Sequence, residues 1–402
     1  MDAIDYLLTR GVDSVYPSRE ALEKVLRSGK KLRLYQGFDP TGTQFHIGHA
    51  VGLRKLKQWQ DLGHHVIFLI GDGTGQAGDP SGKTRAREKF LSRDELRTNA
   101  KDYVMQAKKI VKFDGPNPAE ILYNGDWLNK LGLSELLDIA GHFTLQQMLE
   151  RDLYQERLKN GSDVSLREFM YPLLQGYDSV AMNVDLELGG SDQIFNMLAG
   201  RKLVSQMLHK EKFVMSVPLL TDSKGVKIGK TEGNVIGLTD PANEFYAKIM
   251  SLGDDAIIPC FTLLTDESEE NIKDMEKRMK DGGNPMVYKK MLALELTKEF
   301  NDESAAKKAQ ENFEALFQTK TQIMNGQSRI ALPKITIEKN TYNPIDLLIM
   351  TGHATSRSEA RRLLEQKAVE INGILVDSKQ HDIGVKKGDI MKIGKKYFVE
   401  LV

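Results

Sequence analysis

Two histidines beside a glycine- and proline-containing turn are the first residues whose types and spacing suit a reaction. They belong to the segment GFDPTGTQFHIGHA at 37–50, where a predicted strand ends in the turn. His46 and His49 are three residues apart at the start of a predicted helix, so both imidazoles lie on one face. A helix N-terminus attracts phosphate through its unpaired N–H groups and partial positive charge. The pair would stabilise charge that develops in a transition state, with Asp39 and Thr41 on the turn beside it.

Two alternatives stay open for this pair on its spacing alone. Zinc would need a third protein ligand, and none of the other six histidines stands at a familiar ligand spacing. We therefore expect no protein-bound zinc and no other metal site. The second alternative is a purely structural pair of histidines.

A glycine-rich segment, GDGTGQAGDPSGKTRAR at 71–87, follows the next predicted strand and partly matches two nucleotide-binding patterns. Three of its glycines fit G-x-G-x-x-G, but that fingerprint opens a helix, and here Gly82 interrupts any early helix. The GKT at 82–84 suggests a P-loop, but the glycine required five residues before Gly82 is Ala77. Neither pattern is satisfied.

What remains in this segment is a loop with an acid, Asp79, and the cations Lys83, Arg85 and Arg87. Such a loop would hold an ammonium group and a polyphosphate together. A solvated basic loop is the alternative.

Polar residues also gather on one face of a predicted helix, YPLLQGYD at 171–178. Tyr171, Gln175 and Asp178 fall at i, i+4 and i+7, which favours either a lined pocket or a buried hydrogen-bonded cluster. The segment GGSDQIFN at 189–196 follows a predicted strand. Its glycines allow the backbone to approach a ligand closely, and an acid there would bind ribose hydroxyls. The residues concerned are Gly190, Asp192 and Gln193.

A fourth segment, LTDSKGVKIGKTEGN at 220–234, is a glycine-punctuated loop that carries Lys227 and Lys230. Mobile lysines of this kind would close over departing phosphates. Most lysine-rich loops are only solvated, so this segment is weak evidence by itself.

The elements that must position these residues form a parallel α/β sheet. Residues 32–37 and 65–71 are predicted strands, and the helical pattern 46–62 between them completes a βαβ unit. The alternation continues with predicted strands at 119–124, 183–189 and 214–220. Residues 125–165 are helix-rich and interrupt it, so we interpret them as an insertion. Four of its apolar residues would be core or a subunit contact: Phe143, Leu145, Met148 and Leu149.

We expect several domains, because 402 residues exceed what one hydrophobic core usually serves. The predicted fold class is a Rossmann-like α/β catalytic domain at 1–235, an α-helical domain at 236–320, a polar linker at 321–342 and a small α+β domain at 343–402. The N-cap and first helical position expected at Asn284 and Pro285 support the helical middle.

Composition is ordinary for a globular protein, with 40% hydrophobic and 28% charged residues. Lys plus Arg equals Asp plus Glu at 56 each, so any contact with nucleic acid must come from local basic surfaces. The single cysteine, Cys260, excludes an intramolecular disulfide framework. Because we find neither a signal peptide nor an apolar run of about 18 residues, we expect a cytoplasmic protein without membrane contact.

Taken together, HIGH at 46–49 and KIGKT at 227–231 resemble the two signatures of class I aminoacyl-tRNA synthetases. GFDPT, GDPSGK, YxxLQGYD and GGSDQ between them resemble the tyrosyl branch, and residues 343–376 resemble an S4 RNA-binding domain. The second signature departs from its consensus at Ile228, Gly229 and Thr231, although both lysines are present.

The resemblance implies ATP with Mg²⁺, L-tyrosine and tRNA(Tyr) as ligands, a homodimer, and ligation of tyrosine to the tRNA. It implies that Tyr35 and Asp178 bind the phenol and that Asp79, Tyr171 and Gln175 bind the ammonium group. The remaining implied roles fall into three sets. Thr41, His46 and His49 stabilise the phosphates; Lys83, Arg87, Lys227 and Lys230 bind pyrophosphate; and Gly37, Asp39, Gly48, Gly190, Asp192 and Gln193 contact ATP or the adenylate.

In residues 343–402 ten Lys/Arg stand against eight Asp/Glu, so RNA binding would depend on clustering. The candidates are Arg357, Arg361 and Arg362 on a predicted helix, with Lys395 and Lys396 near a terminal strand. A solvated charged helix face is the alternative. For the whole chain, the rival functions are a class I-like nucleotidyltransferase that does not bind RNA and a non-catalytic RNA-binding relative of a synthetase.

Overall fold

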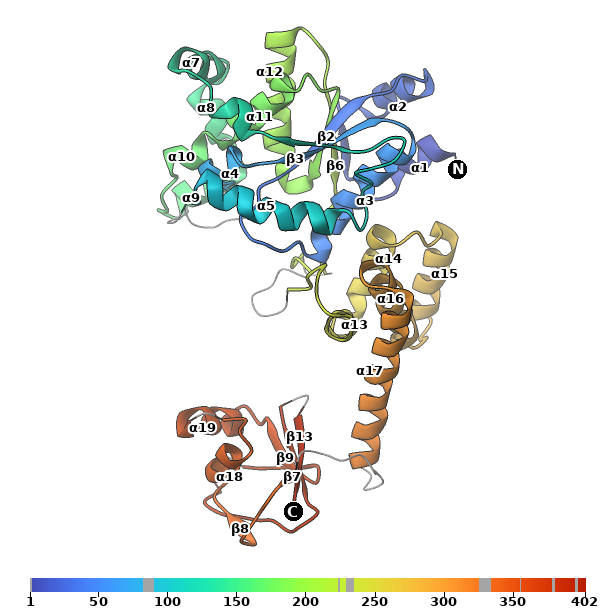
Figure 1. Cartoon of the computed structure of the whole chain (residues 1–402), viewed down its shortest axis with the longest axis vertical. Coiled ribbons are helices and arrows are strands. Elements are labelled where there is room, and N and C mark those ends of the chain that lie inside the picture. The colour runs from blue at the N-terminus through green and yellow to red at the C-terminus, as the bar shows by residue number, and fades with distance from the viewer. Residues whose placement is uncertain are drawn as a thin grey trace. The chain divides into compact units, whose positions relative to one another are not determined.

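The computed structural model describes residues 2–81, 90–222, 225–228, 235–324, 334–354, 356–377, 380–394 and 397–402. The chain divides into two compact units, Met1–Gln310 and Glu311–Val402, and each is described by itself (Figure 1).

A six-stranded sheet forms the centre of the first unit, with the strand order β1-β6-β5-β2-β3-β4. All neighbours pair in parallel except β1, which is antiparallel to β6. Five strands match predicted ones to within a few residues, whereas β1 was not predicted. The bounds are β1 Ser14–Tyr16, β2 Arg33–Phe38, β3 His65–Ile70, β4 Glu120–Tyr123, β5 Leu186–Gly190 and β6 Phe213–Val217.

The strand order reverses between β2 and β5, which are neighbours in the sheet. From this point one crossover, helix α3 (Ile47–Asp61), leads outward to β3, and another, α12 (Ile194–Leu208), leads the opposite way to β6. Right-handed crossovers in opposite directions place these helices on opposite faces of the sheet. Ligands of such sheets bind at the carboxyl ends of the strands beside the reversal, so the topology marks one place for a site.

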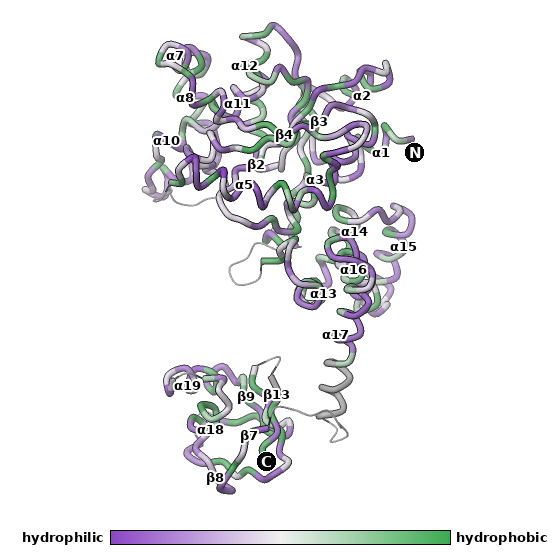
Figure 2. Tube along the Cα trace, viewed as in Figure 1, coloured by the Kyte–Doolittle hydropathy of each residue, from purple (hydrophilic) through white to green (hydrophobic). Residues whose placement is uncertain are grey.

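Apolar residues are concentrated on the strands, where both faces of the sheet are covered (Figure 2). Strand β3 is buried at every position after His65. Helix α11 (Tyr171–Ala181) packs along α12, and α5 (Arg93–Ala107) follows the glycine-rich loop. Smaller helices complete this part of the unit: α1 Ala3–Thr9, α2 Arg19–Arg27 and α4 Thr74–Ala77.

The predicted insertion at 125–165 is helical. Met148 lies in an apolar cluster with Leu173 and Leu203, and Phe143 packs against that cluster, whereas Leu145 is exposed. Its helices are α6 Gly125–Leu128, α7 Leu133–Gly141, α8 Leu145–Leu149 and α9 Asp152–Lys159, and α10 Leu166–Phe169 follows directly.

The strands give way to helices after residue 240, as predicted. Asn284 caps α16, whose first residue is Pro285, so both occupy the expected positions. Cys260 is buried on α14. The helices are α13 Ala242–Met250, α14 Ile257–Leu264, α15 Glu269–Lys280, α16 Pro285–Phe300 and α17 Glu303–Met324.

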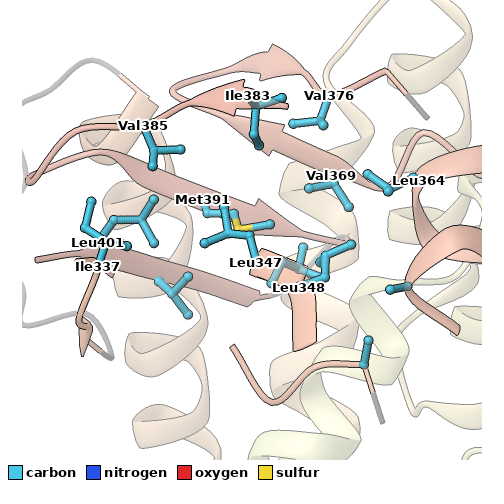
Figure 3. Close-up of a cluster of buried hydrophobic side chains, with 14 residues drawn as sticks. Ile337, Leu347, Leu348, Leu364, Val369, Val376, Ile383, Val385, Met391 and Leu401 are labelled. Atoms are coloured by element: carbon cyan, nitrogen blue, oxygen red, sulfur yellow. The ribbon is translucent and has the colours of Figure 1, made fainter. Parts of the chain in front are cut away.

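The second unit has its own apolar core, in which Leu347, Met391 and Leu401 are fully buried (Figure 3). The segment 321–342, expected to be a linker, contributes strands β7 and β8 to this unit, because β7 pairs with β13 and β8 pairs with β11. The elements are β7 Lys334–Ile335, β8 Thr341–Tyr342, α18 Pro344–Met350, α19 Arg357–Glu365, β9 Val369–Ile371, β10 Ile374–Leu375, β11 Ile383–Gly384, β12 Ile390–Ile393 and β13 Tyr397–Leu401.

Candidate active site

A cleft of about 320 Å³ lies where the topology marks a site, and its lining includes residues of both β2 and β5. Every described residue of the first unit that was predicted for the site lines this cleft. These residues are Tyr35, Gly37, Asp39, Thr41, His46, Gly48, His49, Asp79, Tyr171, Gln175, Asp178, Gly190, Asp192, Gln193 and Lys227. The predicted Lys83, Arg87 and Lys230 lie outside the described residues.

The two histidines form the N-terminus of α3. His46 is the N-cap, and its Nδ1 accepts the N–H of Gly48 at 3.1 Å, while Nδ1 of His49 accepts the N–H of His46 at 3.2 Å. The ring centroids are 4.0 Å apart. A Cβ on Gly48 would approach the His46 ring to 2.9 Å, so glycine is needed for this packing. No acidic residue occupies the first turn, which leaves the positive end of the helix available to an anion.

The turn before α3 is held by a buried hydrogen-bond network. Asp39 accepts from the Thr74 hydroxyl at 2.7 Å and from the Tyr171 hydroxyl at 2.9 Å. A side chain at Gly71 would collide with the Asp39 carboxylate. Glycine at position 71 therefore allows close packing of the loop against the turn.

Asp178 lines the cleft and is 1% exposed. One carboxylate oxygen accepts from Asn124 Nδ2 at 2.9 Å and the other from Trp127 Nε1 at 2.8 Å. Burial raises the pKa of Asp178 well above its usual range, and these two donors act in the opposite direction.

Sequence reasoning missed Asn124 and Trp127 as partners of Asp178. The available signal was the position of Asn124, directly after β4 at the edge of the sheet where strand ends meet.

Tyr35 and Gln175 also line the cleft. The Tyr35 hydroxyl lies 3.0 Å from Ser179 Oγ, and burial raises its pKa, so the phenol stays protonated. Gln175 donates from Nε2 to Glu187 at 3.0 Å, while its Oε1 is buried without a hydrogen-bond partner among the described residues. An acceptor in this position suits a ligand with N–H groups.

Two further contacts between predicted residues lie in the cleft. Gln193 donates to Asp79 at 2.8 Å, and Lys227 forms an ion pair with Asp192 at 3.1 Å. The cleft therefore combines carboxylate and amide acceptors with two imidazoles at a helix N-terminus and a buried carboxyl. This arrangement fits a molecule with a hydrogen-bonding tip, a central cation and an adjoining polyphosphate.

Comparison with known proteins agrees with this chemistry. Residues 27–318 match the model of tRNA synthetases class I (W and Y), and residues 323–400 match that of the tyrosine–tRNA ligase SYY-like C-terminal domain. The tyrosine–tRNA ligase of Thermotoga maritima is 40% identical over 98% of this chain and 96% of its own length. That of Francisella tularensis is 40% identical over 98% and 97%, respectively. The chain belongs to the class I tyrosine–tRNA ligase family.

Solved structures support the fold of this synthetase. A C-terminally truncated mitochondrial tyrosyl-tRNA synthetase of Aspergillus nidulans has a TM-score of 0.65 and 26% identity, covering 78% of this chain and 94% of that one. The enzyme of Archaeoglobus fulgidus, solved with L-tyrosine, has a TM-score of 0.60 and 21% identity, over 77% of this chain and 100% of that one.

The remaining predictions concern the second unit, metal binding and membrane contact. Arg357, Arg361 and Arg362 are exposed on α19 of the second unit, and Lys395 and Lys396 lie outside the described residues. Within the described ranges, no group of three or more His, Cys, Asp or Glu side chains is placed to hold a metal ion. None of the described helices combines the length and apolar character needed to cross a bilayer.

Proposed function

We propose that this synthetase activates L-tyrosine with ATP and then ligates it to the 3′ end of tRNA(Tyr). In the first step a carboxylate oxygen of tyrosine attacks the α-phosphorus of ATP, and the bond to pyrophosphate breaks. In the second step a terminal ribose hydroxyl of the tRNA attacks the carbonyl carbon, and AMP leaves. ATP enters as its magnesium complex, so Mg²⁺ is part of the substrate. No covalent enzyme intermediate is needed, because positioning and charge stabilisation suffice.

The single observation that carries this proposal is one cleft lined by both the buried Asp178 and the paired imidazoles of His46 and His49. Asp178 and Tyr35 would bind the phenol hydroxyl. A buried acceptor there favours tyrosine over phenylalanine, since an apolar ring would leave it without its ligand partner.

The ammonium group of tyrosine would be bound by Asp79, Tyr171 and Gln175. The Tyr171 hydroxyl donates its hydrogen to Asp39, so its oxygen remains an acceptor for the substrate. Together with the carboxylate of Asp79 and the Oε1 of Gln175, the ammonium group meets three acceptors.

The nucleotide would lie across the N-terminus of α3. Three residues, Thr41, His46 and His49, stabilise the phosphates, while Lys83, Arg87, Lys227 and Lys230 bind the departing pyrophosphate. The other nucleotide contacts come from Asp192 and Gln193 to the ribose and from close approach at Gly37, Asp39, Gly48 and Gly190. The ion pair between Lys227 and Asp192 must open for both to take these roles.

Tyrosine-dependent exchange of labelled pyrophosphate into ATP tests the proposal. We expect exchange with tyrosine and little with phenylalanine or tryptophan. A class I-like nucleotidyltransferase would ignore tyrosine, and a non-catalytic RNA-binding relative would show no exchange. The match of residues 323–400 to a synthetase C-terminal domain argues against the first rival.

We further propose a cytoplasmic homodimer that binds tRNA(Tyr), with the exposed arginines of α19 contacting phosphates. Exposed leucines on the helical insertion support a subunit contact: Leu133 is 74% exposed and Leu166 is 77% exposed. Sedimentation of the wild type and of Leu133→Asp checks the dimer. A monomeric wild type would contradict it.

A further inference from the structure

A buried ion pair lies directly behind the proposed tyrosine site. Lys212, just before β6, is 0% exposed, and Glu187 on β5 is 1% exposed. The Lys212 ammonium contacts the Glu187 carboxylate and also donates to Ser179 Oγ at 2.6 Å and to the Met197 carbonyl at 3.3 Å. Removing two charges from water is costly, and an apolar pair is often at least as stable. Stability alone therefore does not account for this pair.

The Glu187 carboxylate contacts side chains that belong to both ends of the tyrosine site. Its Oε1 accepts from Gln175 at 3.0 Å, and its Oε2 accepts from Ser179 at 3.3 Å. Ser179 in turn lies 3.0 Å from the Tyr35 hydroxyl. Glu187 pairs with Tyr35 across the β2–β5 register and lines the same cleft. One buried carboxylate thus joins two residues to which substrate contacts are assigned.

The contact with Glu187 determines which end of the Gln175 amide faces the cleft. A side-chain amide has a donor end and an acceptor end, whereas an ionised carboxylate only accepts. Glu187 therefore takes the NH₂ of Gln175, which leaves Oε1 for the ligand. That oxygen is buried and has no partner among the described residues, and an ammonium group has donors only.

We propose that Glu187 and Lys212 are positioning residues of the tyrosine site: the ion pair keeps Glu187 acceptor-only, and Glu187 directs the Gln175 carbonyl oxygen at the substrate ammonium. The inference rests on the proposed function and adds two residues to it. Burial lowers the pKa of Lys212, and the adjacent Glu187 carboxylate opposes that effect. The two charges therefore support each other in an environment that disfavours either one alone.

Two variants give different predictions for the orientation of Gln175. In Glu187→Gln, Lys212 attracts the oxygen of the new amide. The NH₂ of that amide then faces Gln175 and attracts the Gln175 oxygen. The NH₂ of Gln175 is thereby turned toward the ammonium group of the substrate. In the double variant Glu187→Gln with Lys212→Met no charge enforces that orientation, so both are populated. We expect the single variant to be the more impaired in tyrosine recognition.

The readout is the ammonium-specific part of binding. Equilibrium dialysis compares tyrosine with 3-(4-hydroxyphenyl)propanoate, which lacks the ammonium group, for the wild type, both variants and Gln175→Ala. We expect the tyrosine-to-analogue affinity ratio to fall by about tenfold to a hundredfold in Glu187→Gln, the range for a hydrogen bond to a charged group. In pyrophosphate exchange, KM for tyrosine should rise while KM for ATP stays near the wild-type value.

If tyrosine and the analogue both bind more weakly by the same factor, the affinity ratio stays unchanged. The ion pair would then be merely structural, and the inference would be overturned. Thermal melting shows whether each variant folds. We expect the single variant to fold, since Lys212 keeps Ser179 and Met197 as partners there. If one variant does not fold, the affinity ratio of the other still tests the inference. A wild type without tyrosine-dependent exchange would instead overturn the proposed function.

Discussion

Replacing Asp178 with Asn tests the role of its carboxylate in the cleft with almost no change in the shape of the side chain. Both oxygens of the carboxylate serve protein donors, at 2.9 Å to Asn124 and 2.8 Å to Trp127. An amide has only one oxygen, so its NH₂ must face one of these N–H groups, donor against donor. The substitution also removes the negative charge that would accept the phenol hydroxyl of tyrosine.

These two losses act on different quantities. The stranded buried donor is present with or without substrate, so it lowers the free energy of unfolding by about 1–3 kcal/mol. Loss of the charged acceptor weakens only the complex, by about 1.5–3 kcal/mol, the range for a hydrogen bond to a charged group. At about 1.4 kcal/mol per factor of ten, kcat/KM for tyrosine falls roughly 10- to 150-fold.

Pyrophosphate exchange with tyrosine and with phenylalanine measures the second loss, and urea unfolding measures the first. Phenylalanine lacks the hydroxyl, so its kcat/KM should change little and the selectivity for tyrosine should fall by nearly the whole factor. Asp114→Asn, at an exposed position outside the cleft, is the matched control. Unchanged selectivity in Asp178→Asn would refute the assignment of Asp178 to the phenol.

Three further predictions concern other parts of the first unit. Lys230→Ala should bind tyrosine normally but form the adenylate slowly in single-turnover assays, and a normal rate would contradict its assignment to pyrophosphate. Gly48→Ala should lower kcat by more than about tenfold, because the added Cβ displaces the His46 ring. A loss of this size is typical when a catalytic group is misplaced, and KM for tyrosine should stay unchanged. Burial lowers the pKa of His64 to about 4 in the folded chain, compared with about 6.5 in the unfolded chain. Between these two pH values the unfolded chain binds more protons than the folded chain. The free energy of unfolding should therefore fall by up to about 3 kcal/mol as the pH drops through this window. Urea midpoints should lose this slope in His64→Asn and keep it in His142→Asn.

Much of the fold follows from local pattern. Strand β3 is a nearly continuous apolar run, and the more mixed β2 ends in a turn with glycine and proline, so the type and approximate ends of both were predictable. Strand β1, with only three half-buried residues, carries no such pattern and is defined by its pairing with β6. The same applies to β7 and β8, two-residue strands that exist through their partners β13 and β11. Their short polar sequences suggested a linker.

The cleft was predictable for a different reason. Many of its residues stand at strand ends and helix starts, which the βαβ pattern brings to one edge of the sheet, and Gln175 and Asp178 share one face of α11 with Tyr171. Residues that contact the cleft residues from outside the cleft, such as Trp127 or Lys212, lie in segments whose packing the βαβ pattern does not specify. Lys212 in particular reads as an ordinary lysine before a strand, and only its full burial against Glu187 distinguishes it.

The roles proposed for the residues that line the cleft constrain which amino acid can react. With the phenol at Asp178 and the ammonium group at Gln175 and Asp79, the carboxylate is placed by covalent geometry, because it shares a carbon atom with the ammonium group. In the proposed roles it then points toward the N-terminus of α3, where His46 and His49 would hold the α-phosphate within reach. An amino acid with a shorter side chain could not reach both points. If its side chain bound Asp178, its carboxylate would lie too far from that phosphate. If its ammonium group bound Gln175 and Asp79, Asp178 would have no phenol to bind. Selection and activation thus depend on the same two fixed points, so substitutions at either end should lower the rate of adenylate formation as well as the affinity for tyrosine.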